Sequence, residues 1–136
     1  NYGMHTKVGS NFFANYNFIV QDDGGVTIGD NFMAGPNVTL STPLHPLSGR
    51  QRAGMVNEKG ETFIPCYAKP ITIGNDVWLC AGVIVCAGVT IGDGAVIGAG
   101  SVVTHDIPAG VLAYGVPCRV IREITKEDEK AMEALI

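Results

Sequence analysis

One histidine and two closely spaced arginines are the side chains of this sequence best suited to chemistry. His45 lies in the segment TPLHPLSGR, and an imidazole titrates near neutral pH, so it can accept the proton of an attacking hydroxyl group. Arg119 and Arg122 are close neighbours in YGVPCRVIREI, and guanidinium groups suit the recognition of phosphate. The plainer alternatives are an exposed loop histidine and a solvated basic face.

Thiol chemistry has less support. The chain has four cysteines, with no CxxC pair and no regular spacing, which argues against a zinc ribbon and a disulfide framework: Cys66, Cys80, Cys86 and Cys118. We therefore expect free, reduced thiols and a cytoplasmic protein. We expect no metal.

The composition indicates one folded domain over residues 1–136. The chain is 46% hydrophobic and 16% charged, which argues against disorder. Its net charge of −4 and the lack of a long basic run give no footprint for nucleic acid. The charge-free run VWLCAGVIVCAGVTIG at 77–92 is shorter than the roughly 20 residues that cross a membrane. The sequence starts at Asn1 without a methionine, which leaves room for an upstream segment.

A six-residue repeat in the sequence predicts the fold that positions these side chains. Large aliphatic residues recur every six positions in the second half of the chain: Ile73, Leu79, Val85, Ile91, Ile97 and Val103. The same period, with one slip of two residues, appears in the first part: Val8, Ala14, Val20, Ile28, Ala34 and Leu40. Such a period predicts an all-β parallel β-helix, in which three short strands form a coil of eighteen residues. Residues eighteen apart should stack, with Ile73 on Ile91, Leu79 on Ile97 and Val85 on Val103.

The glycines at 29, 74, 92 and 98 suit coil corners where φ turns positive. The repeat occupies 1–41 and 71–108. Between them, 42–70 breaks the period as a long excursion loop, whose Phe63, Ile64 and Tyr67 predict packing on another surface. The segment 109–136 ends in a predicted short helix over 126–135, with Thr125 as N-cap, covering an end or side of the coil.

The sequence resembles the hexapeptide-repeat acyltransferases. The resemblance rests on VTIGDN at 26–31, LHPLSGR at 44–50, PITIGNDVWL at 70–79, GVTIGDGAVIGAGSVVTHDIP at 88–108 and YGVPCRVIREI at 114–124. It is closest to the maltose/galactoside O-acetyltransferase branch, which includes the nodulation-type acetyltransferases, and covers nearly the whole chain. It implies a left-handed coil, a homotrimer with active sites between subunits, and acetyl transfer from acetyl-CoA to a sugar hydroxyl.

The resemblance also implies residue roles. His45 matches the general base, and Asn15 matches an asparagine that stabilises the transition state. Asp23 matches a carboxylate that binds the acceptor, and Asn1 falls where the family has an acceptor-binding serine. Six positions match contacts to CoA: Ala81, Ala99, Thr104, His105, Arg119 and Arg122. At one of them, His105, the family has a lysine, which predicts a weaker phosphate contact at neutral pH.

The β-helix repeat is also compatible with other functions. A related acetyltransferase could act on an antibiotic or on serine, although LHPLSGR fits the sugar branch better. A carbonic-anhydrase-like β-helix needs three converging histidines to bind its metal ion. The histidines here, His5, His45 and His105, lie 40 and 60 residues apart, which argues against metal ligation. A non-enzymatic coil would favour an uninterrupted solenoid or a regular threonine array, which the loop and the two arginines argue against.

Overall fold

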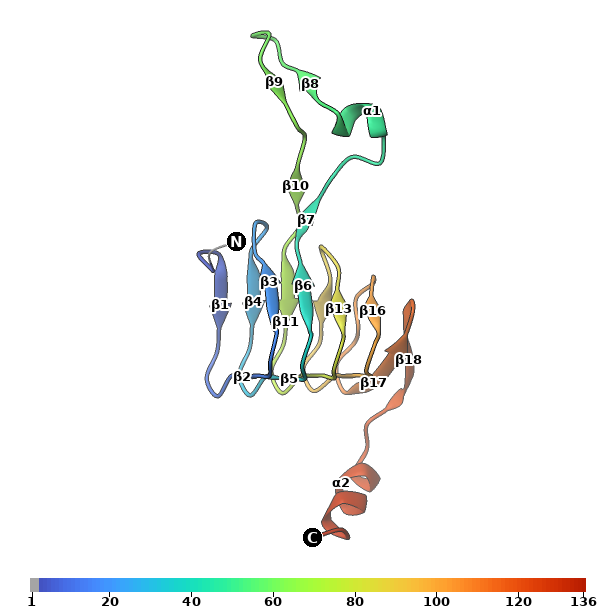
Figure 1. The fold of residues 1–136 in the computed structure, drawn as a ribbon. Coiled ribbons are helices and arrows are strands. Elements are labelled where there is room, and N and C mark those ends of the chain that lie inside the picture. The colour runs from blue at the N-terminus through green and yellow to red at the C-terminus, as the bar shows by residue number, and fades with distance from the viewer. Residues whose placement is uncertain (1–2) are drawn as a thin grey trace.

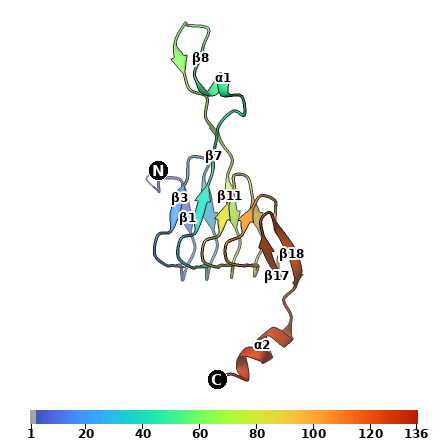
Figure 2. The ribbon, with the colours of Figure 1, turned by 45° about the vertical axis from the view of Figure 1, so that its right-hand side comes forward.

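The computed structural model describes residues 3–136 as a three-sided coil of short parallel strands (Figure 1). A hairpin loop extends from one edge of the coil, and a helix extends beyond the opposite side (Figures 1 and 2). Asn1, one of the predicted acceptor-binding residues, lies outside the described residues.

Each side of the coil is one sheet. Sheet 1 runs in the order β1 (Thr6–Val8), β4 (Val26–Ile28), β11 (Ile71–Ile73) and β14 (Thr90–Ile91). Sheet 2 contains β2 (Phe13–Ala14), β5 (Met33–Ala34), β12 (Trp78–Leu79), β15 (Val96–Ile97), β17 (Val111–Gly115) and β18 (Cys118–Glu123). Sheet 3 contains β3 (Ile19–Gln21), β6 (Thr39–Ser41), β13 (Ile84–Val85) and β16 (Val102–Val103).

The predicted stacking is confirmed by the strand register. Ile73 pairs with Ile91, Leu79 with Ile97 and Val85 with Val103, all in parallel ladders. The slip of two residues in the first block is seen in the strand register, because Val8 pairs with Ile28 and Val20 with Leu40, each twenty positions apart. The extra residues lie between Val20 and Ile28, in the turn after β3.

The core is the inside of the coil. The inward aliphatic side chains are buried from the second coil onward, where Leu79, Val85 and Ile97 have no exposed surface, whereas Val8 of the first coil is half exposed. Burying a side chain of this size contributes about 1.5–3 kcal/mol. In the first two coils the rings of Phe12 and Phe32 stack, with centroids 5.3 Å apart.

The four corner glycines of the sequence pattern do not adopt positive φ, so that prediction is wrong. Positive φ occurs two residues further on, at Asp76 and Gly94 for example. Gly74 is needed for space instead, because a Cβ there would lie 2.8 Å from the backbone nitrogen of Asp93 in the next coil. The close approach of adjacent coils therefore selects glycine at these corners.

The excursion loop leaves the coil after β6 and returns at β11. Its base is the antiparallel pair β7 (Pro43–Leu44) and β10 (Tyr67–Ala68), followed outward by helix α1 (Gly49–Arg52) and the hairpin of β8 (Met55–Val56) and β9 (Thr62–Phe63). Phe63, Ile64 and Tyr67 are exposed in the single chain, so the surface predicted to cover them is not within it.

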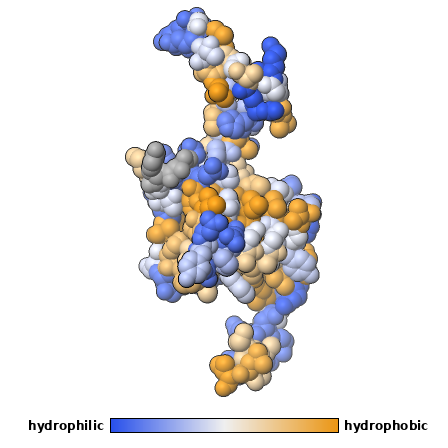
Figure 3. All heavy atoms as spheres, viewed as in Figure 1, coloured by the Kyte–Doolittle hydropathy of each residue, from blue (hydrophilic) through white to orange (hydrophobic). Residues whose placement is uncertain are grey.

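Helix α2 spans Lys126–Glu133 and ends two residues before the predicted boundary. Thr125 caps it as predicted, and Asp128 completes a capping box. The helix buries no residue and extends away from the coil, so the prediction that it covers the coil is wrong for the single chain (Figures 1 and 2). Hydrophobic residues gather at its free end (Figure 3).

Between residues 3 and 136, no helix is long and apolar enough to cross a membrane. All four cysteines are free thiols. Burial raises the pKa of the Cys80, Cys86 and Cys118 thiols.

Candidate active site

His45 stands at the base of the excursion loop, one residue after the last ladder pair of β7 and β10, which joins Leu44 to Tyr67. Pro46 follows it and favours an extended backbone at His45. The imidazole is exposed, and its Nδ1 lies 3.1 Å from the carbonyl oxygen of Pro65. A carbonyl can only accept a hydrogen bond, so Nδ1 carries the proton in this contact. Nε2 of a neutral ring then has its lone pair available.

Asp23 lies at the same edge of the coil, between sheets 3 and 1, which we call the loop edge. It is exposed in the turn that joins β3 to β4. That turn is fastened to the start of the loop, because the Thr42 hydroxyl accepts a hydrogen bond from the Gly24 amide and donates one to the Gln21 carbonyl, at 2.9 and 2.7 Å.

Asp22, next to Asp23, is a buried carboxylate that no sequence pattern singled out. Its Oδ2 accepts hydrogen bonds from the His5 amide and the Thr6 hydroxyl, at 2.8 and 2.9 Å. The His5 amide is the main cause of a lowered pKa of Asp22, and burial opposes it. The carboxylate therefore ties the turn that carries Asp23 to the first coil.

Thr104 and His105 lie further along the loop edge, after β16. Their side chains contact each other, with Thr104 Oγ1 2.9 Å from His105 Nδ1. The loop edge thus carries four predicted site residues: Asp23, His45, Thr104 and His105.

Asn15, Ala81 and Ala99 lie on a different edge, between sheets 2 and 3, which we call the Asn15 edge. They follow β2, β12 and β15, which lie in sheet 2 with β5 between β2 and β12. Ala81 and Ala99 are exposed. Small side chains there leave the backbone open to a ligand.

The Asn15 side chain is oriented by its own backbone. Its Oδ1 accepts a hydrogen bond from the Tyr16 amide at 2.7 Å, which leaves the Nδ2 group as the available donor. Asn15 and Tyr16 line an open hollow of about 440 Å³.

Arg119 and Arg122 are both on β18, opposite Tyr114 and Leu112 of β17. Arg119 is exposed, and its Nη1 donates a 3.2 Å hydrogen bond to the Cys118 carbonyl. This strand pairing places Arg119 near the end of sheet 2 that borders the Asn15 edge.

Arg122 is already engaged by a carboxylate. It forms a bidentate pair with Asp128 of α2, with bonds of 2.9 and 2.7 Å. The pair raises the pKa of Arg122 and lowers that of Asp128 to about 2. Both line a hollow of about 260 Å³ beside Trp78.

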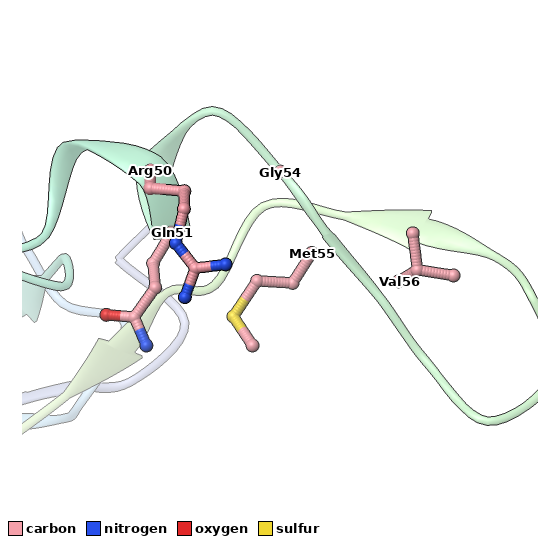
Figure 4. A pocket seen from close by; sticks show the side chains of 5 residues that line it. All are labelled: Arg50, Gln51, Gly54, Met55 and Val56. Atoms are coloured by element: carbon pink, nitrogen blue, oxygen red, sulfur yellow. The ribbon is translucent and has the colours of Figure 1, made fainter.

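A further hollow of about 280 Å³ lies in the excursion loop, where the side chains of Arg50 and Met55 extend into a common space (Figure 4). None of the predicted site residues lines it. Among residues 3–136, no three His, Cys, Asp or Glu side chains gather closely enough to hold a metal ion.

The structure therefore divides the predicted residues between two edges. His45 and Asp23 lie on the loop edge, whereas Asn15 and the two alanines lie on the Asn15 edge, with the whole of sheet 3 between them. A side of about five extended residues spans roughly 17 Å. One chain alone does not bring the predicted base and the predicted amide donor together.

Comparison with known proteins identifies the same six-residue repeat that the sequence pattern indicates. Residues 70–105 match the bacterial transferase hexapeptide (six repeats). The chain is 52% identical over 128 residues to the galactoside O-acetyltransferase of Escherichia coli, covering 94% of this chain and 59% of that protein. The chain therefore carries the hexapeptide repeat of bacterial transferases and is similar to a sugar O-acetyltransferase over nearly its whole length.

Solved structures agree with this similarity. A maltose O-acetyltransferase from Clostridium difficile 630 superposes with a TM-score of 0.81 at 48% identity, over 91% of this chain and 62% of that one. A galactoside acetyltransferase in complex with coenzyme A gives 0.82 at 52% identity, over 94% and 60%. The shared fold is the left-handed parallel β-helix that the sequence resemblance implied. The chain spans about three fifths of the length of these relatives.

Proposed function

We propose that this protein transfers an acetyl group from acetyl-CoA to a hydroxyl group of a sugar or sugar-like acceptor. The observation that carries the proposal is the likeness, over nearly the whole chain, to a galactoside acetyltransferase solved with coenzyme A. The exposed His45 supports it, because its contact with Pro65 leaves Nε2 as a proton acceptor.

The reaction is a direct transfer in a ternary complex. The acceptor oxygen attacks the thioester carbonyl carbon as its proton passes to His45 Nε2. A C–O bond forms, the C–S bond breaks, and the proton finally passes to the departing thiolate of CoA. The Nδ2 group of Asn15 donates a hydrogen bond to the oxyanion that forms between these steps. Asp23, together with Asn1, binds acceptor hydroxyl groups.

CoA lies along the Asn15 edge in this proposal. Ala81 and Ala99 let its chain approach the backbone, and Arg119 and Arg122 supply positive charge for its phosphates. Thr104 and His105 complete the phosphate contacts from the loop edge. The protein itself is negatively charged, so these local cations are needed to attract CoA.

The active site lies between two subunits of a homotrimer in this account. The separation of His45 and Asn15 by sheet 3 is the reason, since a neighbouring coil can place its own Asn15 edge against the loop edge. The outward faces support such packing. Sheet 1 exposes Thr72, whereas sheets 2 and 3 expose the apolar side chains of Trp78 and Ile84. The number three comes from the family, and the free thiols support a place in the cytoplasm.

An acceptor screen tests the function. The protein is incubated with acetyl-CoA and a panel of galactosides, maltose, aminoglycoside and chloramphenicol-type antibiotics, and serine, and the release of free CoA thiol is measured. Turnover with sugars is expected, with a kcat about 10²–10⁴-fold lower for His45→Ala. Acetylation of serine or an antibiotic alone would contradict the sugar assignment. Unchanged turnover in His45→Ala would contradict the role of this histidine.

A further inference from the structure

The side chain of Arg52 is hydrogen-bonded to the backbone immediately after His45. Its Nη1 donates hydrogen bonds to the carbonyl oxygens of Pro46 and Leu47, at 2.7 and 2.8 Å. Side chains on a helix lean toward its N-terminus, so an arginine at the end of the short α1 reaches back over the residues that precede the helix. Hydrogen bonds from a guanidinium are stronger than those between neutral groups.

The base of the loop has little else to hold this segment. Helix α1 buries no residue, and the loop projects away from the coil (Figure 1). The Pro65 carbonyl fixes the direction of the His45 ring but not the path of its backbone. Past Leu44 the ladder with β10 has ended, and the Arg52 side chain then holds Pro46 and Leu47 on the far side of His45.

We propose that Arg52 is a positioning residue for the proposed general base, acting by locking the His45–Pro46–Leu47 backbone. The proposal rests on the proposed function of His45. Arg52 contributes through the place of the imidazole and not by contact with acetyl-CoA. Its loss should therefore lower kcat while leaving the KM for acetyl-CoA unchanged.

Arg50 provides a matched control. It lies two positions earlier on the same helix and is also exposed, but its side chain donates no hydrogen bond to the backbone that follows His45. Its side chain instead faces Met55 (Figure 4). Arg50→Met and Arg52→Met remove the same charge from the same helix, and both keep an unbranched apolar stem.

The test is a double-mutant cycle with His45. Arg52→Met should lower kcat about tenfold, since small displacements of a catalytic group are costly. Arg50→Met should stay within about twofold of the wild type. In the His45→Ala background, Arg52→Met should cause no further loss, because the group it positions is gone. Thermal unfolding followed by circular dichroism checks that each variant keeps its coil.

Two results would overturn the role of Arg52 while leaving the proposed role of His45 intact. One is equal kcat for Arg52→Met and Arg50→Met while His45→Ala is inactive. The other is the same fractional loss from Arg52→Met with and without His45, which would show that Arg52 acts elsewhere. Wild-type turnover in His45→Ala would instead overturn the proposed role of His45, and the inference with it.

Discussion

At the level of single residues, the proposed active site consists of exposed side chains whose neighbours fix their orientation. The Pro65 carbonyl accepts a hydrogen bond from Nδ1–H of His45, which leaves Nε2 as the proton acceptor. In the same way, Asp128 holds the Arg122 guanidinium in one position and offsets its charge. Arg119 has no carboxylate partner in residues 3–136, so it is the freer of the two arginines to bind phosphate.

Arg119→Ala should therefore weaken the binding of acetyl-CoA more than Arg122→Ala does. Loss of one charge-assisted contact should raise the KM for acetyl-CoA about tenfold, with little change in the KM for the acceptor. Added salt should weaken the wild type in the same direction. Steady-state kinetics at two salt concentrations measure this. An unchanged KM for acetyl-CoA would remove Arg119 from the phosphate site.

His45 could be predicted from the sequence because it lies in the loop that interrupts the repeat and matches the general base of the family that the sequence resembles. Its partners could not be selected in the same way. Pro65 lies twenty residues away along a loop whose path no periodicity describes. Arg52 is one of several cations in that loop, and only the structure shows that its side chain turns back onto Pro46 and Leu47.

At the scale of elements, the coil corners make two different demands on glycine. Gly74 has no room for a side chain, because a Cβ would meet the backbone of Asp93. Gly100 has open space but a φ of +71°, a conformation that asparagine tolerates and that Asn37 adopts two coils earlier.

Asparagine substitution separates the two demands. Gly74→Asn should destabilise the fold by about 1–3 kcal/mol, as overpacking does. Gly100→Asn should change stability by less than about 1 kcal/mol. Denaturant unfolding of both variants gives the comparison. Equal losses at the two positions would contradict the claim that the close spacing of coils selects glycine at Gly74.

The stability that the Asp128–Arg122 pair gives to α2 should be lost at acidic pH. The pKa of Asp128 is lowered to about 2 from the ordinary 3.8, mainly by its hydrogen bonds to Arg122. The unfolded chain therefore takes up this proton first as the pH falls, and the stabilisation present above about pH 4 is lost between pH 4 and pH 2.

Asp128→Asn should accordingly melt α2 at a lower temperature than the wild type at pH 6, with the difference vanishing near pH 2. Circular dichroism during heating follows the helix. Glu127→Gln is the control, because its pair with Lys130 is highly exposed and should contribute little. A difference that persists at pH 2 would mean that the Asp128–Arg122 pair is not its source.

Secondary structure followed from the sequence where one periodicity governed it. The hexads predicted both the strands and their register, since inward residues such as Leu79 and Ile97 must stack to be buried. The position of α2 did not follow, because Met132 and Leu135 show that the helix has an apolar side but not which surface it meets. Both side chains are exposed in the single chain.

At the scale of the whole molecule, the separation of the two edges is the decisive feature. The loop edge carries the proposed base, and the Asn15 edge carries the proposed oxyanion donor and much of the CoA site, with sheet 3 between them. The exposed apolar residues of the loop and of sheets 2 and 3 would be covered by neighbouring coils. Hydrophobic residues indeed spread over the visible face of the coil (Figure 3).

Subunit mixing shows whether His45 and Asn15 of different chains form one active site. His45→Ala and Asn15→Ala chains, each inactive alone, are unfolded together at equal concentrations and refolded, and turnover is compared with that of the refolded wild type. In a cyclic trimer with shared sites, each mixed trimer regains one intact site of three, so random mixing should restore about a quarter of wild-type activity. If mixed trimers form, as two distinguishable affinity tags would show, but no activity returns, the account of a site shared between subunits is contradicted.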